Sequence, residues 1–361
     1  MNPPDNSVDR LLDTWIDARW IAGAAVRVER AGQTLVDTAR GLASTDPPIP
    51  ARVDHVWAAA SVSKPLSTMR LMQLVEDGTV QLDQPVADIF PAFGKGLRRH
   101  IRIRHLVTHT SGLSDALPDK ETFTRLGTAG ALATIPLLFP PGTACSYNSA
   151  GFTLMGEIVS KASGLPWADD ARRHLLEPLG MRASSFAPDS AEAEHIARVY
   201  DGQGKLSTWW SFPSQRAAGG PGGGLYTTLA DLARFARACL QKGRGILKPE
   251  TFAQTLGLQT PGLCDLEGNP QSFGLGWYLY RDAPEHNGFA NLLTYHAYGH
   301  AGATGTWLGI DPAHSLVIIL LANRVGLSLS QAAHMREQLV EAALELPSIE
   351  TIPPEYRGHD G

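Results

Sequence analysis

The two ends of the chain carry β patterns and the segments between them carry mainly helical ones, which restricts the folds open to these 361 residues. Near the start, residues 24–30 alternate apolar and polar side chains, and a tight turn leads into a second short strand over residues 34–37. Near the end, residues 305–310 form a candidate strand, and residues 316–321 are apolar at every position. A strand without polar positions predicts a central strand covered on both faces. Residues 273–280 are a further candidate strand of this set.

Helical periodicity occurs in four segments, namely residues 62–77, 152–162, 228–240 and 329–346. Three of them lie between the two β regions. The chain therefore begins a sheet, leaves it for a long helical excursion and returns to complete it. We expect an α/β protein in which residues 1–60 and 265–361 form one discontinuous sheet domain. Residues 61–264 are expected to form a mostly helical inserted domain, with the active site at the junction.

The composition excludes several classes of protein. The net charge is −5 and 19% of the residues are charged, so no large positive field exists to hold nucleic acid. No stretch approaches the roughly 20 apolar residues that span a bilayer, and the first residues lack a signal-peptide pattern. Three cysteines without CxxC spacing argue against a disulfide framework or a zinc site. We expect a soluble, cytoplasmic protein.

The tetrad Ser61-Val62-Ser63-Lys64 lies at the start of the helix predicted over residues 62–77. Residues three apart share a helix face, so the Ser61 hydroxyl and the Lys64 amine can meet. Pro65 suits the first turn, and the helix N-terminus places free N–H groups beside the serine. A serine hydroxyl needs such help because it is a weak nucleophile. Taken alone, however, the pattern fits an N-capping serine and a solvated lysine better.

The surrounding motifs change that interpretation. They are residues 57–65, 78–86, 103–113, 146–152 and 298–305. Together with the tetrad, these stretches resemble the serine β-lactamase and penicillin-binding-protein superfamily, and most closely its class C-like branch, which includes many carboxylesterases and D-amino-acid amidases. The resemblance extends over nearly the whole chain, from about residue 24 to residue 323.

The resemblance implies an antiparallel sheet flanked by helices, no metal or cofactor, and a role for each motif residue. Ser61 would be the acylated nucleophile, and Lys64 would hydrogen-bond it and take its proton. Tyr147 would pass a proton to the leaving group and later activate water. The backbone N–H groups of Ser61 and Ala303 would form the oxyanion hole. Gly302 would be small enough to let substrate approach the strand edge.

Two positions depart from the family pattern. Where the family usually has Tyr-x-Asn, this chain has Ser149 in the third position, a shorter group with one hydroxyl instead of an amide. Where β-lactamases carry a lysine that binds the carboxylate of the antibiotic, this chain has His300. Because histidine is mostly neutral at pH 7, this difference favours neutral esters.

Two histidines and a basic run have simpler explanations than a special site. His105 and His109 are four residues apart and could ligate a metal, but no third ligand follows at useful spacing. The run over residues 98–104 contains four arginines, yet it alternates with apolar residues in an acidic chain. We therefore expect no metal site and a solvated edge in place of an RNA-binding patch.

An aromatic cluster and a cysteine also lie near the motifs. Trp209, Trp210 and Phe212 could form a wall of an acyl pocket, although such clusters more often belong to a core. Cys145 precedes Tyr147 by two residues, but no histidine is adjacent in sequence. We expect Cys145 to be a small buried residue and not a nucleophile.

These observations favour a metal-free serine hydrolase that acts on short or medium acyl esters through an acyl-enzyme. A β-lactamase, a D-amino-acid amidase or peptidase, and an acyltransferase share the first half-reaction, so the motifs do not separate them. A binding protein that has lost its chemistry is a further alternative. The expected partner is a small ester or amide, and the sequence does not indicate an oligomeric state.

Overall fold

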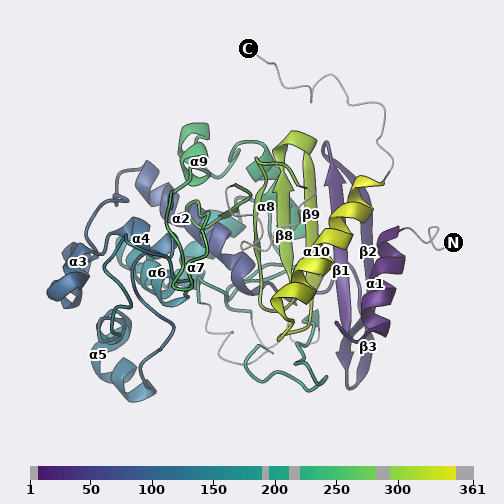
Figure 1. The fold of residues 1–361 in the computed structure, drawn as a ribbon, viewed down its shortest axis with the longest axis horizontal. Helices are drawn as coiled ribbons and strands as arrows, with labels where there is room; N and C mark the ends of the chain where they lie inside the picture. The colour runs from purple at the N-terminus through teal and green to yellow at the C-terminus, as the bar shows by residue number, and fades with distance from the viewer. Residues whose placement is uncertain (1–6, 189–194, 211–219, 282–292, 347–361) are drawn as a thin grey trace, which may run out of the picture.

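The computed structural model describes residues 7–188, 195–210, 220–281 and 293–346, and its centre is an antiparallel sheet. Within these residues the sheet has seven strands in the order β3-β2-β1-β9-β8-β7-β6 (Figure 1). The strands are β1 Gly23–Arg30, β2 Gln33–Thr45, β3 Pro48–Pro50, β6 Tyr278–Leu279, β7 Tyr298–Ala301, β8 Trp307–Asp311 and β9 Leu316–Ala322. A separate ribbon pairs β4 Trp57–Ala58 with β5 Tyr226–Thr227. The expected antiparallel sheet, with the N-terminal hairpin in it, is confirmed.

Strand β9 lies at the centre of the sheet and is buried at all of its positions. Leu316, Ile318 and Leu320 pack in one core cluster with α1 (Ser7–Asp17) and α10 (Leu329–Leu344), which lie on the same side of the sheet (Figure 1). The alternate residues, among them Val317 and Ile319, belong to a second cluster that includes α8 (Leu229–Leu240). Side chains of a strand alternate between its faces, so both faces of β9 are covered, as expected.

The remaining helices lie on the same side of the molecule as α2 (Ser63–Glu76), the helix that begins at the tetrad (Figure 1). They are α3 Val86–Ile89, α4 Ile103–Val107, α5 Lys120–Leu132, α6 Ala150–Ser163, α7 Trp167–Ala171 and α9 Pro249–Thr255. In the described part of the chain, no helix combines the length and the apolar character that crossing a membrane requires. Helix α8 packs on the sheet although it falls within residues 61–264. The domain division at residues 60 and 264 stays a prediction.

The local signals of the sequence explain several helix ends. Thr228 caps α8, because its hydroxyl accepts a hydrogen bond from the backbone N–H of Asp231. Helix α6 ends at Gly164, whose φ of 74° lies in the left-handed region that glycine adopts without strain. Ser328 and Gln331 form a capping box at the start of α10.

One expected strand is largely wrong. Of residues 273–280, only Tyr278 and Leu279 pair with β7. The preceding residues turn against α2, where a Cβ added to Gly276 would lie 2.1 Å from Thr68 Oγ1. Gly276 also has a φ of 73°, outside the extended region that a strand requires. Close packing against the helix therefore replaces ladder pairing over most of this segment.

Candidate active site

Ser61 and Lys64 meet at the start of α2. Ser61 belongs to a short 3₁₀ turn, η1 (Ala60–Val62), that leads directly into the helix. Lys64 Nζ lies 3.1 Å from Ser61 Oγ and donates a second hydrogen bond of 2.7 Å to the carbonyl oxygen of Gly222. The Lys64 side chain is fully buried. A long flexible amine is thus fixed beside the hydroxyl, as the spacing of the tetrad predicts.

The backbone that presents Ser61 is held in an uncommon conformation. Ala60 has a φ of 47°, in the left-handed region that costs a non-glycine residue about 1–3 kcal/mol. Two threonines of the turn between β7 and β8 hold the preceding residues. Thr304 donates a 2.7 Å hydrogen bond to the carbonyl of Ala58, and Thr306 donates one of 2.9 Å to that of Ala59. The tertiary structure thereby fixes the orientation of the nucleophile.

Gly302 and Ala303 belong to the same turn and line the pocket with Ser61. A Cβ on Gly302 would lie 2.5 Å from the carbonyl oxygen of Ala59 and 2.0 Å from Thr306 Oγ1. Gly302 is therefore required because the turn packs closely against the segment before Ser61. From the sequence, a different reason was expected for this glycine, namely access of the substrate to the strand edge. Ala303 is exposed beside this contact.

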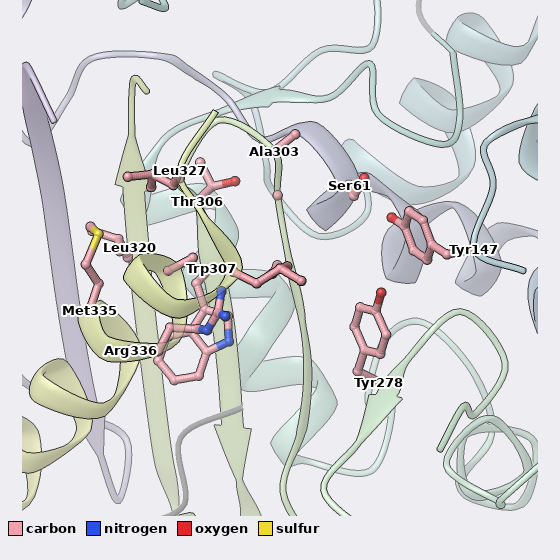
Figure 2. Close-up of a pocket in the computed structure, with 15 residues that line it drawn as sticks. Ser61, Tyr147, Tyr278, Ala303, Thr306, Trp307, Leu320, Leu327, Met335 and Arg336 are labelled. Atoms are coloured by element: carbon pink, nitrogen blue, oxygen red, sulfur yellow. The ribbon is translucent and has the colours of Figure 1, made fainter. Parts of the chain in front are cut away.

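Tyr147 lies across the pocket from Ala303, and its hydroxyl points toward Ser61 (Figure 2). Its ring centroid is 4.7 Å from Lys64 Nζ and 4.4 Å from the centre of the His109 ring. The side chain is 41% exposed, so solvent reaches it. The fold therefore brings Tyr147, which is distant in sequence, together with Ser61 and Lys64.

The loop that carries Tyr147 is fixed by side chains from an earlier segment. The backbone N–H of Asn148 donates to His109 Nδ1 at 3.2 Å. Asp115 Oδ1 accepts hydrogen bonds from the N–H groups of Ser149 (2.6 Å) and Ala150 (3.0 Å), at the start of α6. Ser149 packs beside Gly222 and is not among the residues that line the pocket.

His300 is buried in β7, and the centre of its ring lies 4.7 Å from that of Tyr278 and 6.1 Å from that of Tyr147. Its side chain is 2% exposed, and its Nδ1 donates a 2.7 Å hydrogen bond to the carbonyl of Ala301. Burial, together with the charge of Lys64, lowers the pKa of His300 to about 3. The ring is therefore neutral at pH 7, as expected, but it is not part of the pocket lining.

The two histidines considered as metal ligands have structural partners. His105 Nδ1 accepts a hydrogen bond from the N–H of Arg102 at the start of α4, and burial lowers its pKa to about 4. His109 is fully enclosed, and burial followed by the charge of Lys64 lowers its pKa well below the usual value. Across the described ranges, no three His, Cys, Asp or Glu side chains converge on a metal position.

The remaining candidates lie outside the site. Trp209 is exposed and Trp210 packs against a small cluster around Tyr226, so neither lines the pocket at Ser61. Phe212 falls outside the described residues. Cys145 is buried as expected, and burial raises its pKa to about 12. The basic run alternates buried isoleucines with exposed or half-exposed arginines.

The pocket itself has a volume of about 270 Å³ and extends from Ser61 to the inner face of α10 (Figure 2). Its polar lining residues are Ser61, Tyr147, Tyr278, Thr306 and Arg336, and its walls are largely apolar. The apolar side chains that line it are Trp307, Leu320, Leu327, Leu329, Ala332 and Met335. Such a shape suits a short apolar chain attached to a group that reacts at Ser61.

Sequence reasoning missed the partner of Lys64. The glycine-rich segment over residues 219–224 predicts only a turn, yet the carbonyl oxygens of Pro221 and Gly222 accept hydrogen bonds from Ser67 and Lys64. A Cβ on Gly222 would lie 3.1 Å from Phe152 Cβ. The many glycines of this segment were the signal available in the sequence, because close approach of two backbones requires residues without a side chain.

A family model described as β-lactamase matches residues 8–342 of this chain. Penicillin-binding protein 4 of Amycolatopsis lactamdurans is 30% identical over 94% of this chain and 91% of its own length. Esterase EstB of Burkholderia gladioli is 30% identical over 88% of this chain and 89% of its own length.

Two solved structures have similar folds. EstCE1, described as a hydrolase with promiscuous acyltransferase activity, has a TM-score of 0.76 at 22% identity, covering 93% of this chain and 97% of its own. A class C β-lactamase in complex with cefoxitin has a TM-score of 0.76 at 21% identity, and the match covers 93% of this chain and 98% of the β-lactamase. At this identity the likeness concerns the fold.

Proposed function

Since the chain belongs to the β-lactamase family of serine hydrolases, we propose that it is a carboxylesterase that hydrolyses short or medium acyl esters through an acyl-enzyme on Ser61. The observation that carries the proposal is the 3.1 Å contact between Lys64 Nζ and Ser61 Oγ at the wall of a largely apolar pocket. The similarity to an esterase, at 30% identity over most of both chains, supports the same reaction.

Acylation begins when Ser61 Oγ attacks the carbonyl carbon of the ester and its proton passes to the Lys64–Tyr147 pair. The carbonyl oxygen becomes an oxyanion, which accepts hydrogen bonds from the backbone N–H groups of Ser61 and Ala303. The intermediate then collapses, and the bond between the carbonyl carbon and the alcohol oxygen breaks. The alcohol takes the proton from the pair and leaves, while the acyl group stays on Ser61.

Deacylation uses the same groups with water as the nucleophile. A water molecule gives a proton to the Lys64–Tyr147 pair and attacks the acyl carbonyl carbon. The bond to Ser61 Oγ breaks, the serine recovers its proton and the carboxylic acid leaves. The 41% exposure of Tyr147 supports this step, because water reaches the pocket beside its hydroxyl.

The absence of a lysine in β7 supports an ester over a β-lactam as the substrate. His300 is buried and neutral at pH 7. It therefore offers no cation at the position where β-lactamases bind the carboxylate of the antibiotic. If the protein were instead a β-lactamase, an amidase or an acyltransferase, it would prefer a different acyl donor or acyl acceptor in the experiment below.

The test is intact-protein mass spectrometry after exposure to p-nitrophenyl butyrate, a penicillin and a D-alanyl amide. We expect a transient butyryl adduct on the wild type, steady release of p-nitrophenol, and neither signal from Ser61→Ala. Ser63→Ala is the matched control, because the Ser63 hydroxyl bonds two backbone groups, donating to the Ala60 carbonyl (2.5 Å) and accepting from the Leu225 N–H (3.0 Å). It should lose stability but still acylate. Turnover by Ser61→Ala, or a penicillin hydrolysed faster than the ester, would reject the proposal.

A further inference from the structure

His109 contacts three consecutive residues of the loop that carries Tyr147. Its carbonyl oxygen accepts a 2.9 Å hydrogen bond from the N–H of Ser146, and its Nδ1 accepts one of 3.2 Å from the N–H of Asn148. Between these two bonds, its ring packs on the Tyr147 ring with 4.4 Å between the ring centres. A single residue therefore holds the backbone on both sides of Tyr147 and the side chain itself.

The position of His109 is fixed by its own surroundings. Its side chain is 1% exposed, and the ring centres of Phe152 and Phe273 lie 5.5 and 5.0 Å from the centre of its ring. Its φ of 60° is in the left-handed region, which a residue with a Cβ adopts only where the surrounding structure imposes it. His109 is thus a rigid support for the Tyr147 loop.

The hydrogen bond from Asn148 requires one protonation state of the imidazole. A ring nitrogen that accepts an N–H carries no proton, so the ring is neutral and holds its proton on Nε2. Burial and then the charge of Lys64 lower the pKa of His109 well below its usual value. The acceptor on Nδ1 is therefore preserved at neutral pH.

The place of the Tyr147 hydroxyl depends on this support. A group that transfers a proton must stay within hydrogen-bond reach of the groups that it serves, and the hydroxyl points toward Ser61 (Figure 2). Without Nδ1, the buried N–H of Asn148 would lose its acceptor, and a buried unpaired donor is costly. The loop would then move to pair this N–H, and a shift of 1 Å near a reacting group can lower the rate about 10²-fold.

We propose that His109 is a positioning residue for catalysis, and that its unprotonated Nδ1 keeps the Tyr147 hydroxyl in place beside Ser61. His109 is not among the residues that line the pocket, so it acts on the reaction through Tyr147. The inference rests on the proposed function, because it takes Tyr147 as a group that moves the proton. It also explains the residue type, since imidazole combines an aromatic face with a neutral acceptor.

Two substitutions separate the acceptor from the ring. His109→Asn places an oxygen near the position of Nδ1, and asparagine tolerates the left-handed backbone. His109→Phe keeps a ring against Tyr147 but cannot accept from Asn148. With p-nitrophenyl butyrate, we expect His109→Phe to lower kcat by about 10²-fold with little change in KM. His109→Asn should keep most of the activity.

His105→Phe is the matched control for the loss of an imidazole acceptor. His105 Nδ1 also accepts a backbone N–H at 3.2 Å, from Arg102 at the start of α4, and does not hold the Tyr147 loop. Its substitution should leave kcat unchanged. If His109→Phe did not fold, His109→Gln would replace it, because its amide reaches the position of Nε2 and not that of Nδ1.

A double-mutant cycle tests whether His109 acts through Tyr147. In the Tyr147→Phe background the hydroxyl is gone, so His109→Phe should cost little further activity. A loss of the same size in both backgrounds would indicate a general structural effect and overturn the inference. Equal losses in His109→Phe and His109→Asn would also overturn it, because the ring and not Nδ1 would then be responsible.

Labelling by a fluorophosphonate separates this inference from the proposed function. In this reaction Ser61 Oγ displaces fluoride from phosphorus, so the serine must be activated but no ester is needed. Slower labelling of His109→Phe than of His109→Asn would support the positioning role even if the wild type hydrolysed no ester. Ester hydrolysis by the wild type with an unchanged kcat in folded His109→Phe would refute the role and leave the esterase intact.

Discussion

At the residue scale, Lys64 and Tyr147 form one unit. Lys64 Nζ contacts Ser61 Oγ and lies 4.7 Å from the centre of the Tyr147 ring and 5.2 Å from that of Phe152. A single ammonium group therefore faces both the nucleophile and the aromatic wall. Removal of either member of the pair alters the environment of the other.

We expect Tyr147→Phe to lower kcat by about 10²- to 10⁴-fold, the usual contribution of a general acid–base group. The ring that packs on His109 is kept, so the unfolding free energy should change little. Lys64→Ala should be comparably severe, and the double variant should lose much less than the product of both effects, because the residues act together. Steady-state kinetics with p-nitrophenyl butyrate measures all three.

The control for this prediction is Tyr278→Phe, which removes the other phenol of the pocket. Burial raises the pKa of Tyr278, so this hydroxyl is poorly suited to move a proton, and its loss should cost far less activity. Equal losses in the two Phe variants, or fully multiplicative losses in the double variant, would argue against a Lys64–Tyr147 unit.

At the scale of elements, a buried ion pair joins α2 to α7. Arg70 Nε and Nη2 donate to the two carboxylate oxygens of Asp170 at 2.6 and 3.1 Å, and both side chains are almost fully buried. Arg70 lies about two turns into α2, the helix that follows Ser61, and Asp170 lies on α7. The ion pair therefore fixes the helix that presents the nucleophile.

Asp170→Ala should lower the unfolding free energy by about 3–5 kcal/mol, because it leaves the Arg70 charge buried without a partner. The double variant Arg70→Met/Asp170→Leu should recover much of this loss, since no charge then remains. Urea unfolding followed by circular dichroism measures both. Asp169→Ala is the control, and its exposed carboxylate should contribute less than about 0.5 kcal/mol. A loss below 1 kcal/mol in Asp170→Ala would show that water reaches the pair.

The elements differ in how much the sequence could predict of them. The hairpin, β9, α8 and α10 follow from local periodicity and caps, which are properties of neighbouring residues. Segment 273–280 was misjudged because Gly276 packs against α2 and Gly274 against Thr255 of α9, and both contacts are tertiary features.

The site shows the same division. Ser61, Lys64 and Tyr147 were predicted from motifs. The contact between Gly222 and Lys64 could be found only from the structure, because it joins segments that are far apart in the sequence. Arg336 had a weak signal in the sequence, since a charge stands four residues after Ala332 on the apolar face of α10.

At the scale of the whole molecule, buried histidines make the fold sensitive to acid, and three of them are the most strongly affected. The pKa of His300 is about 3 and that of His105 about 4, and burial lowers that of His109 well below 6.5. At a pH between these lowered pKa values and 6.5, the histidines bind more protons in the unfolded chain than in the folded one. The stability that the neutral histidines contribute is therefore complete above pH 6.5 and is lost as the pH falls.

We expect the unfolding free energy to drop between pH 6.5 and 5 by at most about 1.4 kcal/mol per pH unit for each histidine. Guanidinium unfolding at pH 7.5, 6.5, 5.8 and 5.0 measures the slope. His105→Gln removes one titrating group and should make the slope shallower. A stability that is constant from pH 7.5 to 5.0 would show that these rings take up protons in the folded protein as readily as in the unfolded chain.

The neighbouring places of β1 and β9 in the sheet have a consequence for how the chain acquires its activity. The N–H of Gly23 donates to the side chain of Asn323, 300 positions further along, and the two strands pair over their length. Contacts between such distant segments are slow to form, because a long loop must close first. On the ribosome, the first hairpin is made long before its central partner emerges. The nascent chain then holds Ser61 without β7, β8 or α10, so catalysis should begin only once the last of these has been synthesised and docked.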